Sequence, residues 1–596
     1  MPLRVALPLL LQVIVLALAL ALPAFVGANS YALFVATQLG IYIIAAIGLN
    51  LLAGYAGQVS LGHAAFLAIG AYSVALLTVD HHWSFWAAAA VGMVLAAALG
   101  VLAALPAFRL STWYFAFITL AFALVFEKMI VEWRWLTKGF AGVVGVPPPS
   151  AFGFEFGPRP LYYTVVGVTV VVFILVRNII DSRFGRAFVA VRDVEPAALA
   201  VGASPQHTKL VAFVISAALA GVGGAFFAVQ KTVVTPDDFT ADFSIFFLLT
   251  VVLGGLGTLW GPIIGALVFF LIPELLTGLQ SWRMLIYGSM LLGLMLFAPH
   301  GLYGALRQVW RRFAPPAPQP AAAAQAKARA EHPPIVGLPL EISGLRKHFG
   351  GVLALDGVEF SAPAGSCCAI VGPNGSGKTT LLNLAGGYYA PDAGSVKIGG
   401  LEVLGMSAQK IAALGVGRTF QTPRLVADLT ALDNVMLGSF MRERANIVST
   451  ALRLPSAREE ARRLREEALG FLGFAGVADR AETEAGETPH GQQRLIEIAR
   501  AMMGGARLIL LDEPAAGLSM SELERLERLI ARICALGATV VIVEHHLDLV
   551  ANIASHVTVL DRGTVLAAGK PSAVFNDERV VRAYMGERAL KAGATA

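Results

Sequence analysis

A glycine-rich stretch near the middle of the chain has the residue types needed to bind phosphate. The apolar run Cys367-Cys-Ala-Ile-Val371 predicts a buried strand, and Gly372-Pro-Asn-Gly-Ser-Gly377 follows it directly. Glycines let successive backbone N–H groups converge on phosphate oxygens, and the start of the helix expected after them favours negative charge. The pattern predicts a nucleotide-phosphate site, formed by Asn374, Gly375, Ser376, Gly377, Lys378, Thr379 and Thr380.

Two side chains of this loop have distinct chemistry. Lys378 supplies a point charge to the β- and γ-phosphates, and the Thr379 hydroxyl is a ligand for Mg²⁺. Further along, the apolar run Leu508-Ile-Leu-Leu511 ends in Asp512 and Glu513. Asp512 suits a second contact to Mg²⁺, and Glu513 suits the polarisation of an attacking water. Taken alone, this Asp-Glu pair is equally compatible with a surface turn.

The elements that must position these residues belong to the second half of the chain. From Leu338 onward, short β-type runs alternate with helical patterns, which predicts an α/β domain over residues 338–596. A Pro- and Ala-rich segment, residues 314–337, has the composition of a linker. Residues 1–313 are predicted to form a separate, duplicated polytopic α-helical membrane domain.

Composition and apolar windows support the membrane prediction. The chain is 56% hydrophobic and only 14% charged, against about 25% charged in ordinary soluble domains. Ten windows have about the length that spans a bilayer, although residues 243–280 are also compatible with a broken or re-entrant segment. The windows are residues 5–26, 33–53, 63–79, 85–106, 112–132, 161–180, 208–230, 243–260, 262–280 and 284–300. The first window could be a signal peptide, but its length and the apolar segments that follow favour a retained span.

Charge distribution and cysteine usage predict the membrane orientation of the first half and the compartment of the second. The excess positive charge of the chain, +5, falls entirely before residue 314 and sorts to one side of the predicted spans. This bias predicts that both ends of the membrane domain, and therefore residues 338–596, face the cytoplasm. It argues against a nucleic-acid footprint. The three cysteines, Cys367, Cys368 and Cys534, have no metal-type spacing and are interpreted as reduced core thiols.

Several polar or glycine-rich features of the membrane half have two interpretations. The stretches 54–66 and 254–262 are interrupted by glycine in matching places, which indicates either breaks that line a central path or simple close packing of helices. His63 is interpreted as a packed histidine rather than a ligand. Glu127, Lys128 and Glu274 are expected to reach toward the lipid headgroups rather than to act inside the membrane.

The order of further motifs resembles the ATP-binding cassette (ABC) ATPase family over essentially all of residues 338–596. Phe349 matches the aromatic residue that stacks on adenine, and Gln421 matches the glutamine that senses Mg²⁺ and contacts the permease. Gly491 and Gln492 match the signature motif, which caps ATP on the opposite subunit, and His545 matches the histidine that contacts the γ-phosphate. The resemblance implies ATP and Mg²⁺ as cofactors. It implies Glu513, His545 and Gln421 as catalytic residues and Thr379, Gln421 and Asp512 as metal ligands.

Both halves resemble the branched-chain amino-acid ABC importer family. In the ATPase half the resemblance lies in Arg418-Thr-Phe-Gln421 and Asp512-Glu-Pro-Ala-Ala-Gly-Leu518. In the membrane half it lies in Gly57-Gln-Val-Ser-Leu-Gly-His-Ala-Ala-Phe66 and Ser182-Arg-Phe-Gly-Arg-Ala187. Residues 193–202 resemble the short helix by which importer permeases dock on their ATPase, although an ordinary basic loop is the alternative.

This resemblance implies a subunit of an ATP-driven importer in a bacterial inner membrane, with its ATPase in the cytoplasm and lipid around its spans. The implied partners are a second permease, a second ABC ATPase, a periplasmic or lipid-anchored substrate-binding protein and a small-molecule substrate. Urea, short amides or aromatic acids are alternative substrates on the same scaffold. An exporter or a mechanochemical ATPase is a third reading that the short loops disfavour.

The sequence departs from the family pattern at three places. The signature reads Thr488-Pro489-His490-Gly491-Gln492 and lacks the serine that contacts γ-phosphate. Ala516-Gly-Leu-Ser519, at the D-loop, lacks the usual aspartate, and Thr137-Lys138-Gly139 replaces a Thr-Gly-Gly. The unequal signature predicts a heteromer, in which the partner chain caps the site made by Lys378 and Glu513.

Overall fold

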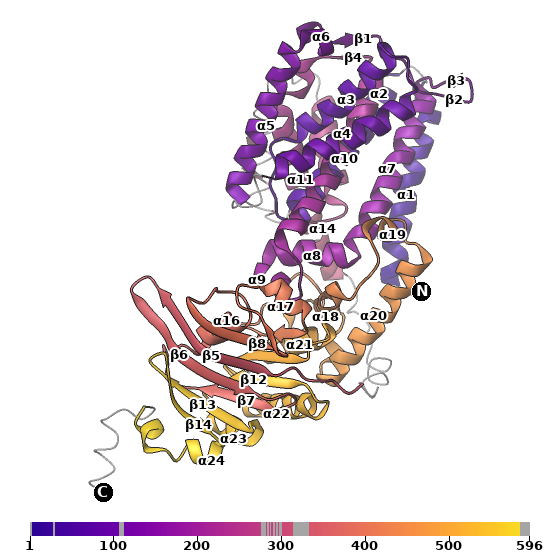
Figure 1. Ribbon diagram of the computed structural model, residues 1–596. Coiled ribbons are helices and arrows are strands. Elements are labelled where there is room, and N and C mark those ends of the chain that lie inside the picture. The colour runs from indigo at the N-terminus through magenta and orange to yellow at the C-terminus, as the bar shows by residue number, and fades with distance from the viewer. Residues whose placement is uncertain are drawn as a thin grey trace. The chain divides into compact units, whose positions relative to one another are not determined.

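The computed structural model describes residues 3–27, 30–105, 112–275, 301–313 and 333–583, with single positions between 282 and 298. The chain divides into two compact units (Figure 1). The first comprises Met1–Arg192, Gln206–Ala317 and Thr450–Leu452, and the second comprises Asp193–Pro205, Pro318–Ser449 and Arg453–Ala596. Most of the predicted linker, residues 314–332, lies outside the described residues.

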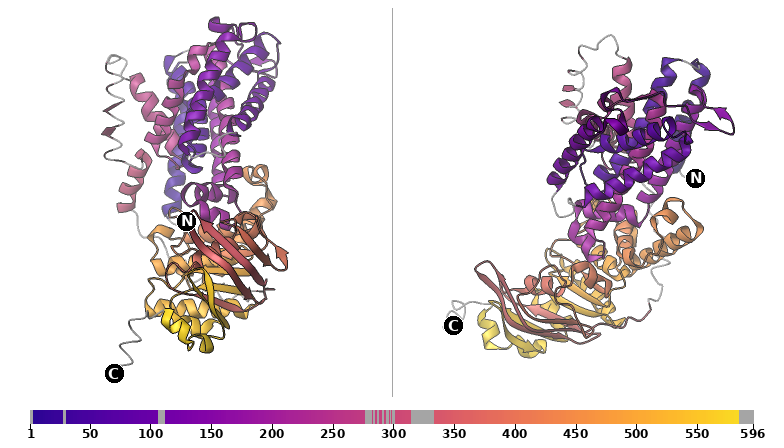
Figure 2. Two further views of the ribbon diagram at one scale, coloured as in Figure 1. Left: turned by 60° about the vertical axis from the view of Figure 1, so that its left-hand side comes forward. Right: turned by 45° about the horizontal axis from the view of Figure 1, so that its top comes forward.

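The first unit consists mainly of apolar helices that run side by side (Figure 2). The first nine predicted windows each coincide with a described helix, and the tenth lies largely outside the described residues. The helices are α1 (Leu3–Phe25), α2 (Tyr31–Asn50), α3 (His63–Val79), α4 (Phe85–Ala104), α5 (Thr112–Glu132), α7 (Pro158–Ile180), α10 (Pro205–Lys231), α11 (Ala241–Gly254) and α12 (Gly261–Leu275). Of the described helices, five are long and apolar enough to cross a membrane, and His63–Val79 is among three shorter apolar ones.

Helices α11 and α12 bear on the two alternatives for the apolar segment that begins at residue 243. Helix α11 has 14 residues, and at about 1.5 Å per residue it is too short to cross a hydrocarbon core of about 30 Å by itself. A Cβ on Gly254 would overlap Gly261 O, and a Cβ on Gly265 would overlap Thr250 O, so the two helices run antiparallel in close contact. Within residues 241–275, glycines end α11 and let α12 fold back against it, as a broken or re-entrant segment requires.

Small residues and packed aromatics hold the other helices together. A Cβ on Gly70 of α3 would overlap Gly221 O of α10, which places these two helices at backbone contact. His63, at the start of α3, is 1% exposed and lies 2.9 Å from Ala45 O through Nε2. Its ring meets Phe247 edge-on at 5.7 Å, which confirms the interpretation of His63 as a packed histidine. Lys128 is 77% exposed beside Glu127, as a side chain reaching toward headgroups requires, and the side chain of Glu274 lies outside the described residues.

The loops that the charge distribution predicts to lie outside the cell are found at one end of the first unit. Strand β1 (Val143–Val144) pairs with β4 (Val233–Val234), and the hairpin β2 (Ser150–Ala151)–β3 (Phe154–Glu155) lies beside α4, where Trp86 Nε1 donates to Ser150 O. Lys138 follows the short helix α6 (Arg134–Thr137) with φ 65° and lies 3.2 Å from an Asp80 carboxylate oxygen. This left-handed backbone is easiest for glycine, so lysine stands here at a conformational cost.

The second unit contains two sheets. A six-stranded sheet has the order β10-β11-β12-β7-β13-β14, parallel except for the β13–β14 pair. Its strands are β7 (Cys367–Val371), β10 (Val416–Arg418), β11 (Leu508–Asp512), β12 (Thr539–Val543), β13 (His556–Asp561) and β14 (Thr564–Gly569). A four-stranded antiparallel sheet has the order β6-β5-β8-β9, formed by β5 (Leu340–Phe349), β6 (Val352–Ala362), β8 (Ala393–Ile398) and β9 (Leu401–Glu402).

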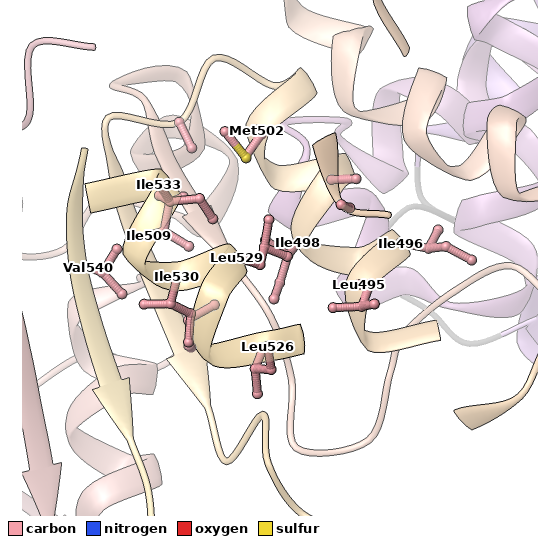
Figure 3. Close-up of a cluster of buried hydrophobic side chains, with 14 of the residues drawn as sticks. Leu495, Ile496, Ile498, Met502, Ile509, Leu526, Leu529, Ile530, Ile533 and Val540 are labelled. Atoms are coloured by element: carbon pink, nitrogen blue, oxygen red, sulfur yellow. The ribbon is translucent and has the colours of Figure 1, made fainter. Parts of the chain in front are cut away.

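Helices pack on the parallel sheet and form its core. Strands β7, β11 and β12 are buried along their whole length, as a sheet covered on both faces requires. Helix α21 (His490–Met503) and helix α22 (Met520–Ala535) bring Ile498 and Ile530 against strand residues such as Ile509 (Figure 3). Around them lie α16 (Lys378–Ala385), α17 (Ala408–Ala413), α18 (Ala431–Leu437) and α20 (Pro455–Phe474). This core fixes the strand ends from which the candidate site is built.

Candidate nucleotide site

Four loops with candidate residues leave the parallel sheet at one edge. Because β7, β10, β11 and β12 run parallel and lie within one sheet, the segments that follow their carboxyl ends emerge together. These segments carry Gly372–Lys378, Thr419–Gln421, Glu513 and Glu544–His545, respectively. The sheet topology thus brings together residues that are as much as about 170 positions apart in the sequence.

The loop after β7 wraps around the start of α16. Gly372, Gly375 and Gly377 all have positive φ, and a Cβ on Gly377 would meet Leu355 Cδ2 at 2.6 Å. Lys378 Nζ donates to the carbonyl oxygens of Gly372 and Pro373, each at 2.9 Å. Burial lowers the pKa of Lys378, while Glu513 and Asp512 oppose that change. Ser376 Oγ is buried and has no hydrogen-bond partner within the described chain, so the loop retains a hydroxyl that is not committed to another group.

Asp512 and Thr379 provide converging oxygens at the end of β11. Thr379 Oγ1 lies 3.4 Å from Asp512 Oδ1, and Asp512 is 2% exposed. Burial raises the pKa of Asp512, and the guanidinium of Arg418, 3.7 Å away, acts in the opposite direction. Mg²⁺ prefers oxygen ligands and usually takes one or two from protein, with the others from phosphate and water. The Thr379 and Asp512 pair fits that requirement, although within the described residues no cluster of three His, Cys, Asp or Glu side chains could hold a metal.

All three residues expected to be catalytic meet at a single carboxylate. Gln421 Nε2 donates to Glu513 Oε2 at 2.8 Å, and His545 Nε2 lies 2.7 Å from Glu513 Oε1. Glu513 has φ 45°, a left-handed conformation that few non-glycine residues adopt. Strain of this kind is held in place by surrounding structure and often marks a functional position. Here the backbone after β11 turns sharply and presents Glu513 between the other two side chains.

Phe349 lies at the end of β5 and is held by neighbours. Its side chain is 42% exposed, its ring meets Tyr389 at 5.2 Å, and Lys347 Nζ lies 5.4 Å from its centroid. The Asp392 carboxylate accepts hydrogen bonds from Lys347 Nζ and from the backbone and ring of His348. These donors lower the pKa of Asp392 to about 2, so it stays ionised and fixes the end of the strand. Phe349 is thus an exposed, oriented ring of the type on which a base can stack.

The signature residues begin helix α21. Pro489 is the N-cap of α21 and offers no side-chain hydrogen bond, whereas the serine usual in the family is a good cap. A Cβ on Gly491 would overlap the Glu522 carboxylate of α22, so a larger residue there would displace that side chain. Gln492 Oε1 is buried without a hydrogen-bond partner in the described chain. No contact joins Gly491 or Gln492 to the residues around Glu513 among those that the structure records.

Sequence reasoning assigned no role to three buried charges on α21 that hold the Gln421 loop. Arg494, Glu497 and Arg500 are at most 2% exposed, and Arg500 Nη2 lies 3.2 Å from Glu497 Oε1. Arg494 donates to the carbonyl oxygens of Phe420 and Gln421. Glu497 Oε1 accepts from Arg424 N at 2.9 Å, and Arg500 Nη1 donates to Arg424 O at 2.6 Å. The i, i+3, i+6 spacing of these charges was the available signal, but charges on a helix normally face solvent.

The segment predicted to dock on the ATPase belongs to the second unit. Helix α9 (Glu195–Ala200) packs on α17, and Tyr388 Oη donates to Pro196 O at 3.2 Å. A Cβ on Gly202 would overlap the side chain of Met441. Ala197 and Ala198 are fully buried. These contacts confirm the docking interpretation of residues 193–202 over that of an ordinary basic loop.

Tyr388 connects this docked helix to the nucleotide site. Arg418 lies over the Tyr388 ring at 4.9 Å, and Phe420 meets the same ring edge-on at 5.7 Å. Burial raises the pKa of Tyr388 to about 12, so its hydroxyl remains a hydrogen-bond donor. Arg418 also pairs with Asp512, and Phe420 directly precedes Gln421. A continuous set of contacts therefore runs from Pro196 through Tyr388 to Asp512 and to the Gln421 loop.

Comparisons with known proteins match each half separately. Residues 31–298 match the family "Branched-chain amino acid transport system / permease component", and residues 355–516 match the family "ABC transporter". The chain is 38% identical over 249 residues to the high-affinity branched-chain amino acid transport ATP-binding protein BraF of Pseudomonas aeruginosa, covering 42% of this chain and 98% of BraF. It is 33% identical over 317 residues to the corresponding permease protein LivM of Escherichia coli, covering 49% of this chain and 74% of LivM.

A solved structure matches the second half. It is a nucleotide-free ATP-binding cassette from an ABC transporter, 31% identical, which covers 42% of this chain and 100% of that structure with a TM-score of 0.38.

A phosphate loop after β7, adjacent carboxylates after β11 and a helical membrane unit define an ABC transporter with its permease and nucleotide-binding ATPase in one polypeptide. More narrowly, the chain belongs to the branched-chain amino acid transport family. It is a multi-pass membrane protein whose cassette hydrolyses ATP in support of transport. Permease and ATPase components of this kind assemble with partner subunits.

Proposed function

We propose that the chain is a subunit of an importer for branched-chain or related small amino acids, driven by ATP hydrolysis. The two independent matches to branched-chain amino acid transport, one in each half, support this proposal most strongly. Residues 1–313 form the permease, residues 314–337 the linker and residues 338–596 the cassette. The protein lies in a bacterial inner membrane with its cassette in the cytoplasm, as the distribution of basic residues suggests.

The proposed hydrolytic mechanism depends on the contacts at Glu513. Glu513 accepts the proton of the attacking water as a general base, and His545 and Gln421 fix the two oxygens of its carboxylate. Lys378 leaves the Gly372 and Pro373 carbonyls to neutralise phosphate charge, and Ser376 Oγ adds a hydrogen bond. Phe349 stacks on adenine.

Thr379, Asp512 and Gln421 would hold Mg²⁺, which neutralises charge on the phosphates when bound. In the present arrangement Gln421 contacts Glu513 through Nε2, so its carbonyl oxygen remains for the ion. The Thr379–Asp512 separation of 3.4 Å already brings two of these donors together.

Gly491 and Gln492 act on the other subunit of the complex. The match of the cassette to the ABC transporter family supports a dimeric arrangement in which each signature caps the ATP of its partner. A second permease and a second ATPase are therefore required, together with a periplasmic or lipid-anchored protein that delivers the small-molecule substrate.

Coupling between hydrolysis and transport runs through α9. Tyr388 contacts Pro196 of α9 and also packs on Arg418 and Phe420. A movement of Asp512 or Gln421 on nucleotide binding therefore shifts the surface on which α9 is docked. Helix α9 then transmits the motion to the permease, to which it is joined at Arg192.

Uptake by the complete complex tests the substrate proposal. The chain, its partner subunits and its binding protein are reconstituted in vesicles, and ATP-dependent uptake of labelled leucine is measured with unlabelled competitors. We expect isoleucine and valine to compete and urea, short amides and aromatic acids to have little effect. Uptake that only urea, an amide or an aromatic acid suppresses would assign the protein to that substrate class instead.

A further inference from the structure

Two glycine breaks in the membrane unit meet directly. Helix α2 continues into a π-helical turn, Leu51–Tyr55, and a Cβ on Gly54 in this turn would overlap the backbone of Gly257, which lies between α11 and α12. The Asn50 side chain closes the contact, because its Oδ1 accepts from Gly257 N at 3.0 Å and its Nδ2 donates to Thr258 O at 2.8 Å. Asn50 is 3% exposed. The two breaks are therefore joined by a buried polar contact rather than by small residues alone.

Arg192 lies across both breaks. Its Nη1 donates to Gly54 O at 2.6 Å, an oxygen at the end of the π-helical turn. A Cβ on Gly57 would meet Arg192 Cγ at 2.7 Å, and a Cβ on Gly257 would meet Arg192 Nη1 at 2.8 Å. Gly57 and Gly257 both have positive φ. The absence of side chains at these glycines thus provides the space that the arginine occupies.

Arg192 lies at the point where the chain passes from the membrane unit to the cassette unit. Arg192 is near the end of helix α8 (Arg183–Asp193) and is the last residue of the first unit before the chain passes to the second. The next segment, Asp193–Pro205, contains α9 and belongs to the compact unit of the cassette. Motion of α9 is consequently applied to the backbone adjacent to Arg192.

We propose that Arg192 is a positioning residue that latches the two glycine breaks together and releases them when α9 moves with the cassette. Corresponding breaks in the halves of a duplicated transporter line the substrate site on the transport path, around which the two halves move. The latch holds one end of that path closed, and ATP-driven movement of α9 draws the guanidinium away from Gly54 O. This inference rests on the proposed transport function, because it assigns the breaks to the path of the substrate.

The contact is strong enough to bias such an equilibrium. A hydrogen bond from a charged group to a carbonyl shifts a two-state population by about tenfold or more when it is removed from one state. Lysine at position 192 can donate to Gly54 O but lacks the planar fork that spans both breaks. We therefore expect Arg192→Lys to retain part of the stabilisation of the closed path and Arg192→Ala to abolish it.

Labelling of a buried cysteine next to the latch tests the proposal. Ala53 lies in the π-helical turn and is 7% exposed, and the membrane unit has no native cysteine in its sequence. Ala53→Cys is introduced into the full complex with Cys534→Ser, since Cys367 and Cys368 are buried. The rate of reaction with a membrane-impermeant maleimide is measured with and without ATP.

The expected result is slow labelling without nucleotide and faster labelling during ATP turnover. Arg192→Ala should raise the nucleotide-free rate about tenfold and remove its dependence on ATP, with Arg192→Lys in between. Gly57→Ala should act in the same direction with Arg192 still present, because the new Cβ displaces the side chain. The matched control is Arg177→Ala, which removes an exposed ion pair to Asp181 and should label as the parent does.

Unchanged labelling in Arg192→Ala, or an equal increase in Arg177→Ala, would overturn the latch. Faster labelling that lysine does not reduce would assign Arg192 a general stabilising role and would also overturn it. The assay needs no substrate. If leucine uptake fails while the labelling pattern holds, the substrate proposal is wrong and the latch stands.

Discussion

His545 Nε2 lies 2.7 Å from Glu513 Oε1, although the two residues follow different strands of the parallel sheet. Gln421 contacts the other oxygen of the same carboxylate at 2.8 Å. A carboxylate that is held at both oxygens has a fixed orientation. A general base requires such an orientation, because it must point at the proton that it accepts. This arrangement makes Glu513 the residue on which the proposed hydrolysis depends.

Replacement of Glu513 by glutamine should therefore stop turnover and preserve ATP binding. The amide keeps the size of the side chain but removes the base, and loss of such a group typically lowers the rate about 10²–10⁴-fold. Steady-state ATPase activity and binding of a fluorescent ATP analogue are measured on the same complex. The partner subunit carries the equivalent substitution, so that only this site reports. Near-normal activity in that complex would remove Glu513 from its proposed role.

The buried charges on α21 should be important for stability. Glu497→Gln leaves Arg494 and Arg500 buried with fewer partners, and removal of one partner from a buried ion pair costs about 3–5 kcal/mol. Chemical denaturation of the complex, followed by hydrogen exchange of peptides from the cassette, measures this loss, because all eight tryptophans of the chain precede the cassette. Glu459→Gln is the matched control, because Glu459 and Arg462 form an i,i+3 pair that is exposed on α20. Equal stability of the two variants would show that the network does not hold the Gln421 loop.

The hydroxyl of Tyr388 should affect coupling more than hydrolysis. Tyr388→Phe removes the hydrogen bond to Pro196 O but keeps the ring that packs on Arg418 and Phe420. We expect the basal ATPase rate to stay within about twofold, because a neutral hydrogen bond contributes about 1 kcal/mol and does not touch the nucleotide. Stimulation of ATPase activity by loaded binding protein should fall. Tyr389→Phe, which alters a neighbouring hydroxyl, is the control, and full stimulation in Tyr388→Phe would contradict the coupling path.

The signature sequence predicts that the chain needs a different partner. A homodimer would cap both ATP sites with Pro489 and His490, without the serine usual in the family. A heteromer allows a complete signature to cap the site of Lys378 and Glu513. Mass measurement and substrate-stimulated ATPase assays on the chain alone in lipid test this prediction. A stable homodimer that imports substrate with only a binding protein added would contradict it.

Residues of the phosphate loop and the Asp512-Glu513 pair could be located from sequence because their chemistry depends on contiguous backbone. A glycine-rich loop after a buried strand has a restricted backbone geometry, so Lys378 and Thr379 could be expected at the carboxyl end of β7, where these side chains lie. Gln421 and His545 could be placed only by resemblance to a family. The sheet order that brings them to Glu513 is a long-range property.

Other features could not be read in advance. Arg494, Glu497 and Arg500 resemble a solvated helix face in sequence, and only packing shows that they are buried. The glycine break at 254–262 was visible in the sequence, but the close antiparallel contact of α11 and α12 on either side of it depends on packing. Glycine breaks at 54–57 and 254–257 were visible, but nothing in their spacing indicated that Arg192 would lie between them.

The central claim, that hydrolysis at Glu513 in this chain drives inward transport by its own complex, is tested most directly by uptake in vesicles. Proteoliposomes with the cassette facing inward, binding protein outside and ATP enclosed are compared for the parent chain and for Glu513→Gln. The account predicts that the parent accumulates labelled leucine above the external concentration and that Glu513→Gln does not, at equal protein content. Equal accumulation by the two, or ATP-driven loss of leucine from preloaded vesicles, would contradict it.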